Sequence, residues 1–231
     1  MQHPKFLDMN CKPKFLGRVP FTLKTGRMHY DRWQKGLEID YGFSFPQSLE
    51  RAVIKRQCEF FAGRYLAKLL LSDLGFPAIY LPTQNRLPEW PDGILGSITH
   101  TRGFVAVIAT RDENFSGVGV DWEKMMSEKT WSSIASRIVT DKEAALCPKG
   151  FSKSHWGTII FSLKESIYKA FYPTVRTYFG FETVVILEVD IVSGCIVFEV
   201  IKDIGDSNLK GFVGKGFFCN YEDTVLTYVA W

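Results

Sequence analysis

The order of helical and strand-like segments constrains the fold of this chain more than any other feature. A helical pattern over residues 48–75 precedes two strand-like runs, at 104–109 and 117–123. A second helical pattern over 154–171 precedes several alternating runs between 184 and 231. Helices mixed with strands in both halves predict an α+β protein.

The same recurrence divides the chain into an N-terminal subdomain, residues 1–124, and a C-terminal subdomain, residues 125–231. It is compatible with duplication of one unit, although identity between the halves is too low to demonstrate it. Prolines punctuate residues 1–46, so we expect this segment to be irregular. Ser48 is expected to cap the first helix, and Pro173 to end the second.

Two local signals mark further boundaries in the C-terminal half. Thr140 and Glu143 have the spacing of a capping box, which predicts a short helix after them. Ser193-Gly194 is a two-residue turn signal between alternating runs and predicts a β-hairpin.

Composition excludes several classes of protein. No apolar run approaches the ~20 residues that span a bilayer, and the N-terminus has no continuous apolar stretch typical of a secretory signal. The five cysteines are an odd number without a Cys-x-x-Cys pair, which argues against a disulfide framework or a zinc knuckle. We therefore expect a cytoplasmic protein with reduced thiols and no membrane partner.

Charge is unevenly distributed along the chain. Residues 1–70 contain 13 Lys and Arg against 6 Asp and Glu, whereas the remainder contains 15 against 19. A basic N-terminal third indicates an anionic partner, which charge alone leaves open as a nucleic acid, a phosphorylated cofactor or an acidic protein.

Two carboxylates stand out in the segment 117–123. Asp121 and Glu123 are two residues apart, so on a strand they project from the same face. Neighbouring carboxylates repel, and a hard cation such as Mg²⁺ would relieve that repulsion through oxygen ligands. A solvated strand end with two unrelated acids would give the same pattern.

A third acid lies in the second long helix. Glu165 and Lys169 are four residues apart and share a helical face. A surface ion pair would explain them, but Phe, Ile, Leu and Tyr crowd this helix and leave little of it exposed. Charged residues in such a helix therefore indicate a functional site.

The segment 96–101 offers donors for phosphate. Thr99 and His100 precede an apolar run, where hydroxyl and imidazole groups at a loop–strand junction can bind an anion. A histidine with only a structural role fits the same sequence. No segment matches a phosphate-binding P-loop or a nucleophile elbow, and covalent catalysis therefore has no support.

Taken in order, these segments resemble the signature of the phosphopantetheinyl transferase superfamily. Its pattern joins a Ser/Thr-His segment, a Gly-(Ile/Val)-Asp-x-Glu strand and a (Phe/Trp)-(Ser/Thr/Cys)-x-Lys-Glu-(Ser/Ala)-x-x-Lys helix. The matching segments are Ile98-Thr99-His100, Gly119-Val120-Asp121-Trp122-Glu123 and Phe161 through Lys169. Segments 55–64 and 86–91 further resemble the two-subdomain branch, of the surfactin type, that activates enterobactin-type siderophore synthetases.

The resemblance implies a fold and a reaction. It implies a monomer of two similar α+β subdomains around a central cleft that binds coenzyme A. It implies Mg²⁺-dependent transfer of the phosphopantetheine arm to a serine of an apo acyl, peptidyl or aryl carrier protein, with release of 3′,5′-ADP. Siderophore, polyketide and fatty-acid synthases all contain such carriers, so the pathway stays open.

The resemblance also implies roles for individual residues. The Mg²⁺ ligands would be Asp121, Glu123 and Glu165, of which Glu165 is also our candidate general base. The phosphates would be contacted by Thr99 and His100, and the 3′-phosphate region or the adenine by Arg56, Arg64 and Arg86. The reacting phosphate would lie near Lys169, with Lys164 beside the metal-binding helix as a further coenzyme A contact.

Two residues depart from the common pattern. Trp122 stands where an aliphatic residue is frequent, but on a strand it faces away from the carboxylates. Thr99 stands where serine is common and keeps the hydroxyl. We therefore expect the metal site to survive both changes.

Three rival functions remain at this point. The basic N-terminal third would suit a nucleic-acid-binding module, but the acidic residues would repel a phosphate backbone, so we expect no nucleic acid partner. Another Mg²⁺-dependent phosphoryl-transfer enzyme would share the carboxylates. A non-catalytic coenzyme A-binding protein would bind without turnover.

Overall fold

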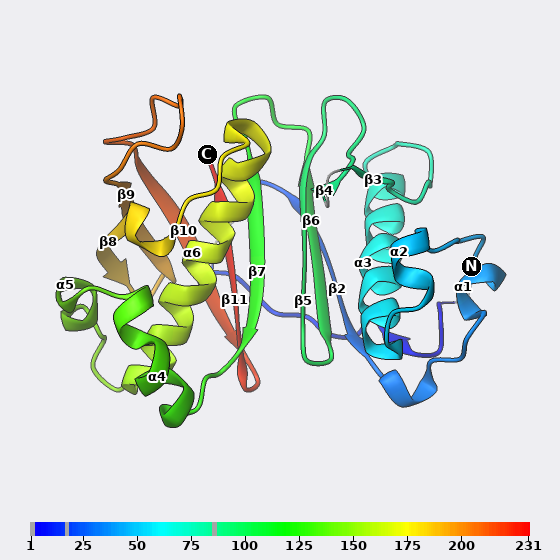
Figure 1. Ribbon diagram of the computed structural model, residues 1–231, viewed down its shortest axis with the longest axis horizontal. Coiled ribbons are helices and arrows are strands. Elements are labelled where there is room, and N and C mark those ends of the chain that lie inside the picture. The colour runs from blue at the N-terminus through cyan, green and yellow to red at the C-terminus, as the bar shows by residue number, and fades with distance from the viewer. Residues whose placement is uncertain (1–2, 17–18, 85–86) are drawn as a thin grey trace.

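The computed structural model describes residues 3–16, 19–84 and 87–231 and contains two larger antiparallel sheets, each packed against a long helix (Figure 1). The N-terminal sheet has the order β1-β2-β6-β5, and helix α3 (Ile54–Asp73) covers one face of it. Its strands are β1 (Leu7–Asp8), β2 (Thr22–Met28), β5 (Leu95–Thr101) and β6 (Phe104–Thr110).

The C-terminal sheet has the order β7-β11-β10-β9-β8, and helix α6 (Lys153–Val175) packs on it. Its strands are β7 (Val118–Lys124), β8 (Val184–Asp190), β9 (Cys195–Val200), β10 (Val213–Tyr221) and β11 (Thr224–Ala230). The α+β architecture with two subdomains is thus confirmed.

Short elements complete the two halves. The N-terminal half adds a 3₁₀ turn η1 (Tyr30–Arg32), helices α1 (Leu37–Asp40) and α2 (Gln47–Glu50), and the small ladder of β3 (Thr83–Gln84) with β4 (Leu87–Pro88). The C-terminal half adds α4 (Glu128–Ile138), α5 (Asp141–Ala145) and η2 (Phe181–Thr183). Among the helices of the described residues, none is both long and apolar enough to cross a membrane.

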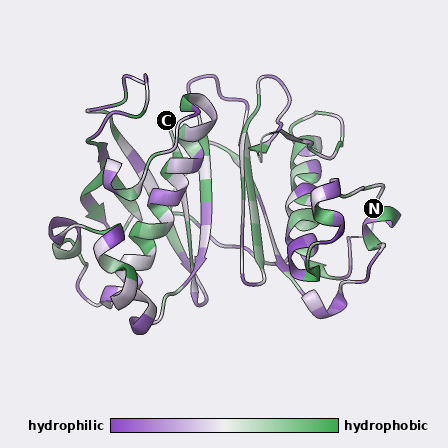
Figure 2. Cartoon of the chain, viewed as in Figure 1, coloured by the Kyte–Doolittle hydropathy of each residue, from purple (hydrophilic) through white to green (hydrophobic). Residues whose placement is uncertain are grey.

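Strand β6 is hydrophobic along its whole length because both of its faces are buried. Val105, Val107 and Ala109 pack under α3, while the alternate residues face a third core between the two sheets. Such a continuous apolar run is typical of a strand covered on both sides. Helices α3 and α6, by contrast, mix hydrophobic and hydrophilic residues (Figure 2).

The two sheets meet where β5 lies against β7, although these strands do not form a backbone ladder. Instead, side-chain hydroxyls of β5 accept the free N–H groups of β7. The Ser97 hydroxyl accepts from the Val120 N–H at 3.1 Å, and the Thr99 hydroxyl accepts from the Trp122 N–H at 3.2 Å. Two hydroxyl residues at alternate positions thus join the halves and satisfy buried donors.

Strand β7 corrects the expected subdomain boundary at residue 124. It pairs with β11 from Thr224↔Lys124 to Ala230↔Val118, and therefore belongs to the C-terminal sheet. The change from one sheet to the other falls between residues 110 and 118. The local pattern predicted the strand correctly but contained no information about its partner, which lies about a hundred residues later in the chain.

Several element boundaries also differ from expectation. Helix α3 begins after Val53, which has no capping side chain, because the segment around Ser48 forms the separate α2. Helix α6 continues through Pro173, where only two further residues of helix follow, so the lost donor costs little. Strand β2 was missed within the proline-rich N-terminal segment, whereas the capping box of α5 is confirmed.

Candidate active site

The candidate site lies where β7 and α6 face the end of β5. Gly117 and Gly119 allow β7 to approach α6 closely, because an added Cβ at either position would clash with a backbone carbonyl of α6. Asp121 and Glu123 follow these glycines on the same strand face. Trp122 points the other way, is fully buried, and stacks on Phe104 in the core between the sheets. The expected opposition of Trp122 and the carboxylates is therefore present.

Asp121 is the most heavily bonded carboxylate of the site. Its side chain is buried, and its Oδ1 atom lies 2.6 Å from the Lys169 ammonium. The Oδ1 atom also accepts from the Thr99 hydroxyl at 3.3 Å, while Oδ2 accepts from the Ser162 hydroxyl at 2.9 Å. These contacts fix the carboxylate, and Lys169 compensates its charge.

Glu123 and Glu165 are half-buried and carry raised pKa values. Burial, followed by repulsion from Asp121, raises the pKa of Glu123 to about 7, with a smaller contribution from Glu165. Burial and Asp121 likewise raise the pKa of Glu165, while Lys169 opposes both shifts. Three carboxyl groups thus share one electrostatic environment. Within the described part of the chain, however, no three such side chains already stand together as a metal-binding group.

Across the cleft, Arg56 forms a cationic edge with His100 as its uncharged partner. The Arg56 Nη1 atom donates to His100 Nε2 at 2.9 Å, which requires a neutral imidazole with a lone pair at that nitrogen. Burial lowers the pKa of His100, and the neighbouring cations lower it further, against the opposing effect of Glu59. His100 is therefore neutral at physiological pH and orients Arg56.

Arg64 is a buried arginine on the same helix. One guanidinium nitrogen donates to the Thr83 hydroxyl at 2.8 Å, and the group lies 4.7 Å from the centre of the Phe60 ring. Burial, followed by the nearby charge of Arg56, lowers the pKa of Arg64 to about 10. Among the described residues its Nε atom has no hydrogen-bond partner and its charge has no acidic one. Such a cation is suited to bind an anionic ligand.

Comparison with known proteins identifies the family of this chain. Residues 45–110 match the sequence model of the 4′-phosphopantetheinyl transferase N-terminal domain, and residues 117–228 match that of the 4′-phosphopantetheinyl transferase superfamily. The chain is 30% identical over 207 residues to the 4′-phosphopantetheinyl transferase Svp of Streptomyces mobaraensis, covering 80% of this chain and 78% of that protein. The chain belongs to the 4′-phosphopantetheinyl transferase superfamily.

Two further relatives support the branch within this superfamily. The chain is 34% identical to the 4′-phosphopantetheinyl transferase PptT of Mycobacterium tuberculosis over 58% of this chain and 59% of that one. It is 37% identical to enterobactin synthase component D of Salmonella typhi over 53% of this chain and 51% of that one. These two matches thus span little more than half of each relative. The predicted superfamily and its enterobactin-type branch are confirmed.

The structure brings most of the predicted residues of this superfamily member to one cleft. Lys169, Thr99 and Asp121 are in direct contact, and Arg56 with His100 lies on the facing edge. Thr99 and His100 lie within strand β5 and not at a loop–strand junction. Arg86 lies outside the described residues.

Lys164 is bonded to the C-terminal core, although it also lines a small pocket that includes Glu165. Its ammonium is buried 2.8 Å from Glu143 Oε1 and donates to the carbonyls of Ile138 and Phe181 at 2.9 and 3.2 Å. Successive helix residues point about 100° apart, so Lys164 faces the core when Glu165 faces the cleft. Lys164 therefore has a structural role in the C-terminal core, and its expected contact with coenzyme A stays a prediction.

Two functional neighbours were missed in the sequence. The Ser162 hydroxyl donates a hydrogen bond to Asp121. Ser162 lies seven residues before Lys169, on the same helical face, and this spacing could have indicated that it belongs to the site. Glu143 binds Lys164, and it was recognised only as the acid of a capping box. A small pocket of about 190 Å³ adjoins Glu165 and has aromatic walls, from Tyr168, Tyr178, Phe179 and Phe181.

Proposed function

We propose that this chain is a 4′-phosphopantetheinyl transferase. It transfers the phosphopantetheine arm of coenzyme A to a serine hydroxyl of an apo carrier protein and releases 3′,5′-ADP. The observation that carries the proposal is the pairing of a carboxylate centre on β7 and α6 with a cationic edge on α3 and β5. Coenzyme A, with a pyrophosphate and a separate 3′-phosphate, has the charges that such a cleft would bind.

Mg²⁺ is the metal that the residues of this site fit. Asp121, Glu123 and Glu165 offer only oxygen donors, as a hard cation prefers, and burial followed by repulsion from Asp121 raises the pKa of Glu123, an effect that a cation would oppose. When bound, Mg²⁺ would neutralise charge on the pyrophosphate. Lys169 now neutralises Asp121, so its ammonium is the group expected to turn toward the phosphates instead.

The chain's own residues can then support the displacement. The carrier serine oxygen forms a bond to the phosphorus that bears the pantetheine arm, and the bond from that phosphorus to the bridging oxygen of the nucleotide breaks. Glu165, whose raised pKa suits a general base, takes the serine proton. Arg56 and Arg64 hold the phosphates on the nucleotide side, where 3′,5′-ADP departs.

The remaining parts of the substrates have candidate sites. The aromatic pocket beside Glu165 would accept the largely uncharged pantetheine arm. The relative named enterobactin synthase component D supports a carrier of siderophore synthesis as the first partner to test. A monomeric, cytoplasmic enzyme stays a prediction.

Intact-protein mass spectrometry tests the reaction. An apo carrier protein is incubated with the chain, coenzyme A and Mg²⁺, and the Asp121→Ala variant is compared with Asp203→Ala, an exposed acid paired with Lys210. We expect the carrier to gain one phosphopantetheine mass with wild type and Asp203→Ala, and none with Asp121→Ala or with chelator. Coenzyme A binding without any gain, across siderophore, polyketide and fatty-acid carriers, would support a non-catalytic binder instead.

A further inference from the structure

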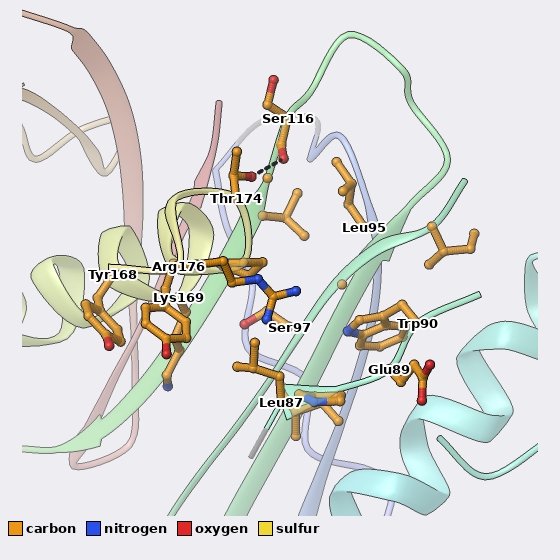
Figure 3. Close-up of a pocket in the computed structure, with 18 residues that line it drawn as sticks. Leu87, Glu89, Trp90, Leu95, Ser97, Ser116, Tyr168, Lys169, Thr174 and Arg176 are labelled. Carbon is orange, nitrogen blue, oxygen red and sulfur yellow. Dashed lines mark hydrogen bonds between the residues drawn. The ribbon is translucent and has the colours of Figure 1, made fainter. Parts of the chain in front are cut away.

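A larger cavity lies in the cleft beyond the carboxylate centre, toward the C-terminal end of α6. Its volume is about 520 Å³, and residues of both halves line it. Figure 3 shows Leu87, Trp90 and Leu95 on one side and the end of α6 on the other. Most lining residues are apolar or aromatic, and the charged ones are Glu89, Lys169 and Arg176, so the cavity suits a flat aromatic group with a polar edge.

One charged side chain enters this cavity from the end of α6. Figure 3 shows Arg176 extending from the helix end toward β5, above Leu87. In the part of the chain that the structure describes, its guanidinium has no ion pair and no hydrogen-bonded partner. Lys169, which also lines the cavity, is bound to Asp121. The guanidinium of Arg176 is thus available to a ligand in the cavity.

The backbone of Arg176 gives an independent reason to assign it a role. Its φ is +52°, in the left-handed region, and its N–H closes the helix on the Tyr172 carbonyl at 2.9 Å. Glycine or asparagine is favoured at such a helix end, because a larger side chain is strained there. Among the described non-glycine residues only Glu222 shares a positive φ, in the tight turn between β10 and β11. An arginine at a position that favours glycine points to a function of its side chain.

We infer that Arg176 is a cofactor-positioning residue whose guanidinium stacks on the purine ring of coenzyme A. This inference rests on the proposed function. Arg56 and Arg64 are already assigned to the phosphates and Arg86 lies outside the described residues, which leaves the face of the purine without an assigned stacking partner among the described residues. A planar guanidinium stacks well on an aromatic face, and the apolar walls of the cavity would enclose the other side of the ring.

Calorimetric binding of 3′,5′-ADP, which carries the same purine, tests the inference without requiring turnover. Arg176→Gly removes the guanidinium and relieves the backbone, so we expect binding weaker by roughly tenfold with an unchanged or higher melting temperature. Glu222→Gly is the matched control, since it relieves the other left-handed residue, whose side chain bonds Arg27 away from the cavity. It should bind 3′,5′-ADP as wild type does.

Arg176→Lys separates stacking from simple charge. If stacking on the purine is the contact, Arg176→Lys loses most of the affinity that Arg176→Gly loses. Full affinity in Arg176→Lys would show that charge alone matters and would overturn the purine assignment. Wild-type affinity in Arg176→Gly would overturn the inference but leave the transferase proposal intact, whereas wild type that binds neither coenzyme A nor 3′,5′-ADP would contradict both.

Discussion

The two halves of the molecule share a plan of one long helix on an antiparallel sheet, but they bring opposite charges to the cleft. The N-terminal half presents Arg56 and the buried Arg64. The C-terminal half presents three carboxyl groups, those of Asp121, Glu123 and Glu165. A phosphate can bind directly to the first surface. It can bind to the second only through a cation, which is why the same anionic ligand requires two different chemistries on the two sides of one cleft.

The largest effect is expected from removing the proposed general base of the C-terminal half. In Glu165→Gln the carrier serine loses its general base, so single-turnover transfer should slow by about 10²–10⁴-fold. Coenzyme A affinity, measured by calorimetry, should change much less. Glu182→Gln, an exposed acid paired with Lys202, is the control and should transfer at the wild-type rate. Full turnover by Glu165→Gln with normal binding would exclude it as the base.

The next effect concerns the core beneath that surface. Lys164→Met leaves the buried Glu143 without its cation, and we expect the free energy of unfolding in urea to fall by about 3–5 kcal/mol. Replacing both residues, as Lys164→Met with Glu143→Leu, should restore only part of that loss, because Glu143 also accepts from the Thr140 and Ile186 N–H groups. Exposed Lys129→Met should have no effect. If Lys164→Met kept its stability but lost coenzyme A affinity, Lys164 would be a cofactor contact after all.

These two neighbouring residues show how far the sequence could predict the site. Helix and strand periodicity placed Glu165, Lys169 and the Asp121 strand on facing surfaces, because periodicity depends only on local geometry. Lys164, one residue from Glu165, could not be assigned in this way. Its direction depends on Glu143, more than twenty residues earlier, and a burial partner at that distance leaves no local signal.

The fold shows the same limit. The residue pattern was sufficient to identify β7 as a strand and its carboxylates as neighbours. Its partner β11 could not be identified, because the pairing is fixed by packing over α6 and not by any turn between the two strands. The joining of the halves through the Ser97 and Thr99 hydroxyls was likewise hidden, since either residue could equally have faced a ligand.

A smaller effect on coenzyme A binding is expected from Arg64 in the N-terminal half. Arg64→Met removes a buried cation while keeping an apolar side chain, so coenzyme A should bind about 10–100-fold more weakly. The free energy of unfolding should stay unchanged or rise, because Arg64 has no acidic partner among the described residues. Lys68→Met, on the same helix over the Tyr80 ring, is the control for affinity. Loss of stability without loss of affinity would make Arg64 a structural residue.

The smallest effect measures the raised pKa of Glu123, which burial and then repulsion from Asp121 produce. The raised pKa of Glu123 means that the folded state binds a proton more tightly than the unfolded state, so this contribution is fully present below pH 4.5 and is lost as the pH rises through about 7. With chelator present, Glu123→Gln should therefore be more stable than wild type by about 1–2 kcal/mol at pH 8, allowing for solvent screening. At pH 5 the two should be nearly equal. A difference in the free energy of unfolding that stayed constant between pH 5 and pH 8 would contradict the raised pKa of Glu123.

We propose that the C-terminal half binds the phosphates of coenzyme A through Mg²⁺, while the N-terminal half binds them directly. Calorimetric titration of coenzyme A, in Mg²⁺ and in chelator, tests this most directly when wild type is compared with Asp121→Asn. We expect Mg²⁺ to tighten coenzyme A binding to wild type by roughly tenfold or more and to leave its binding to Asp121→Asn nearly unchanged. Equal affinity of wild type in Mg²⁺ and in chelator, or a full Mg²⁺ effect in Asp121→Asn, would contradict it.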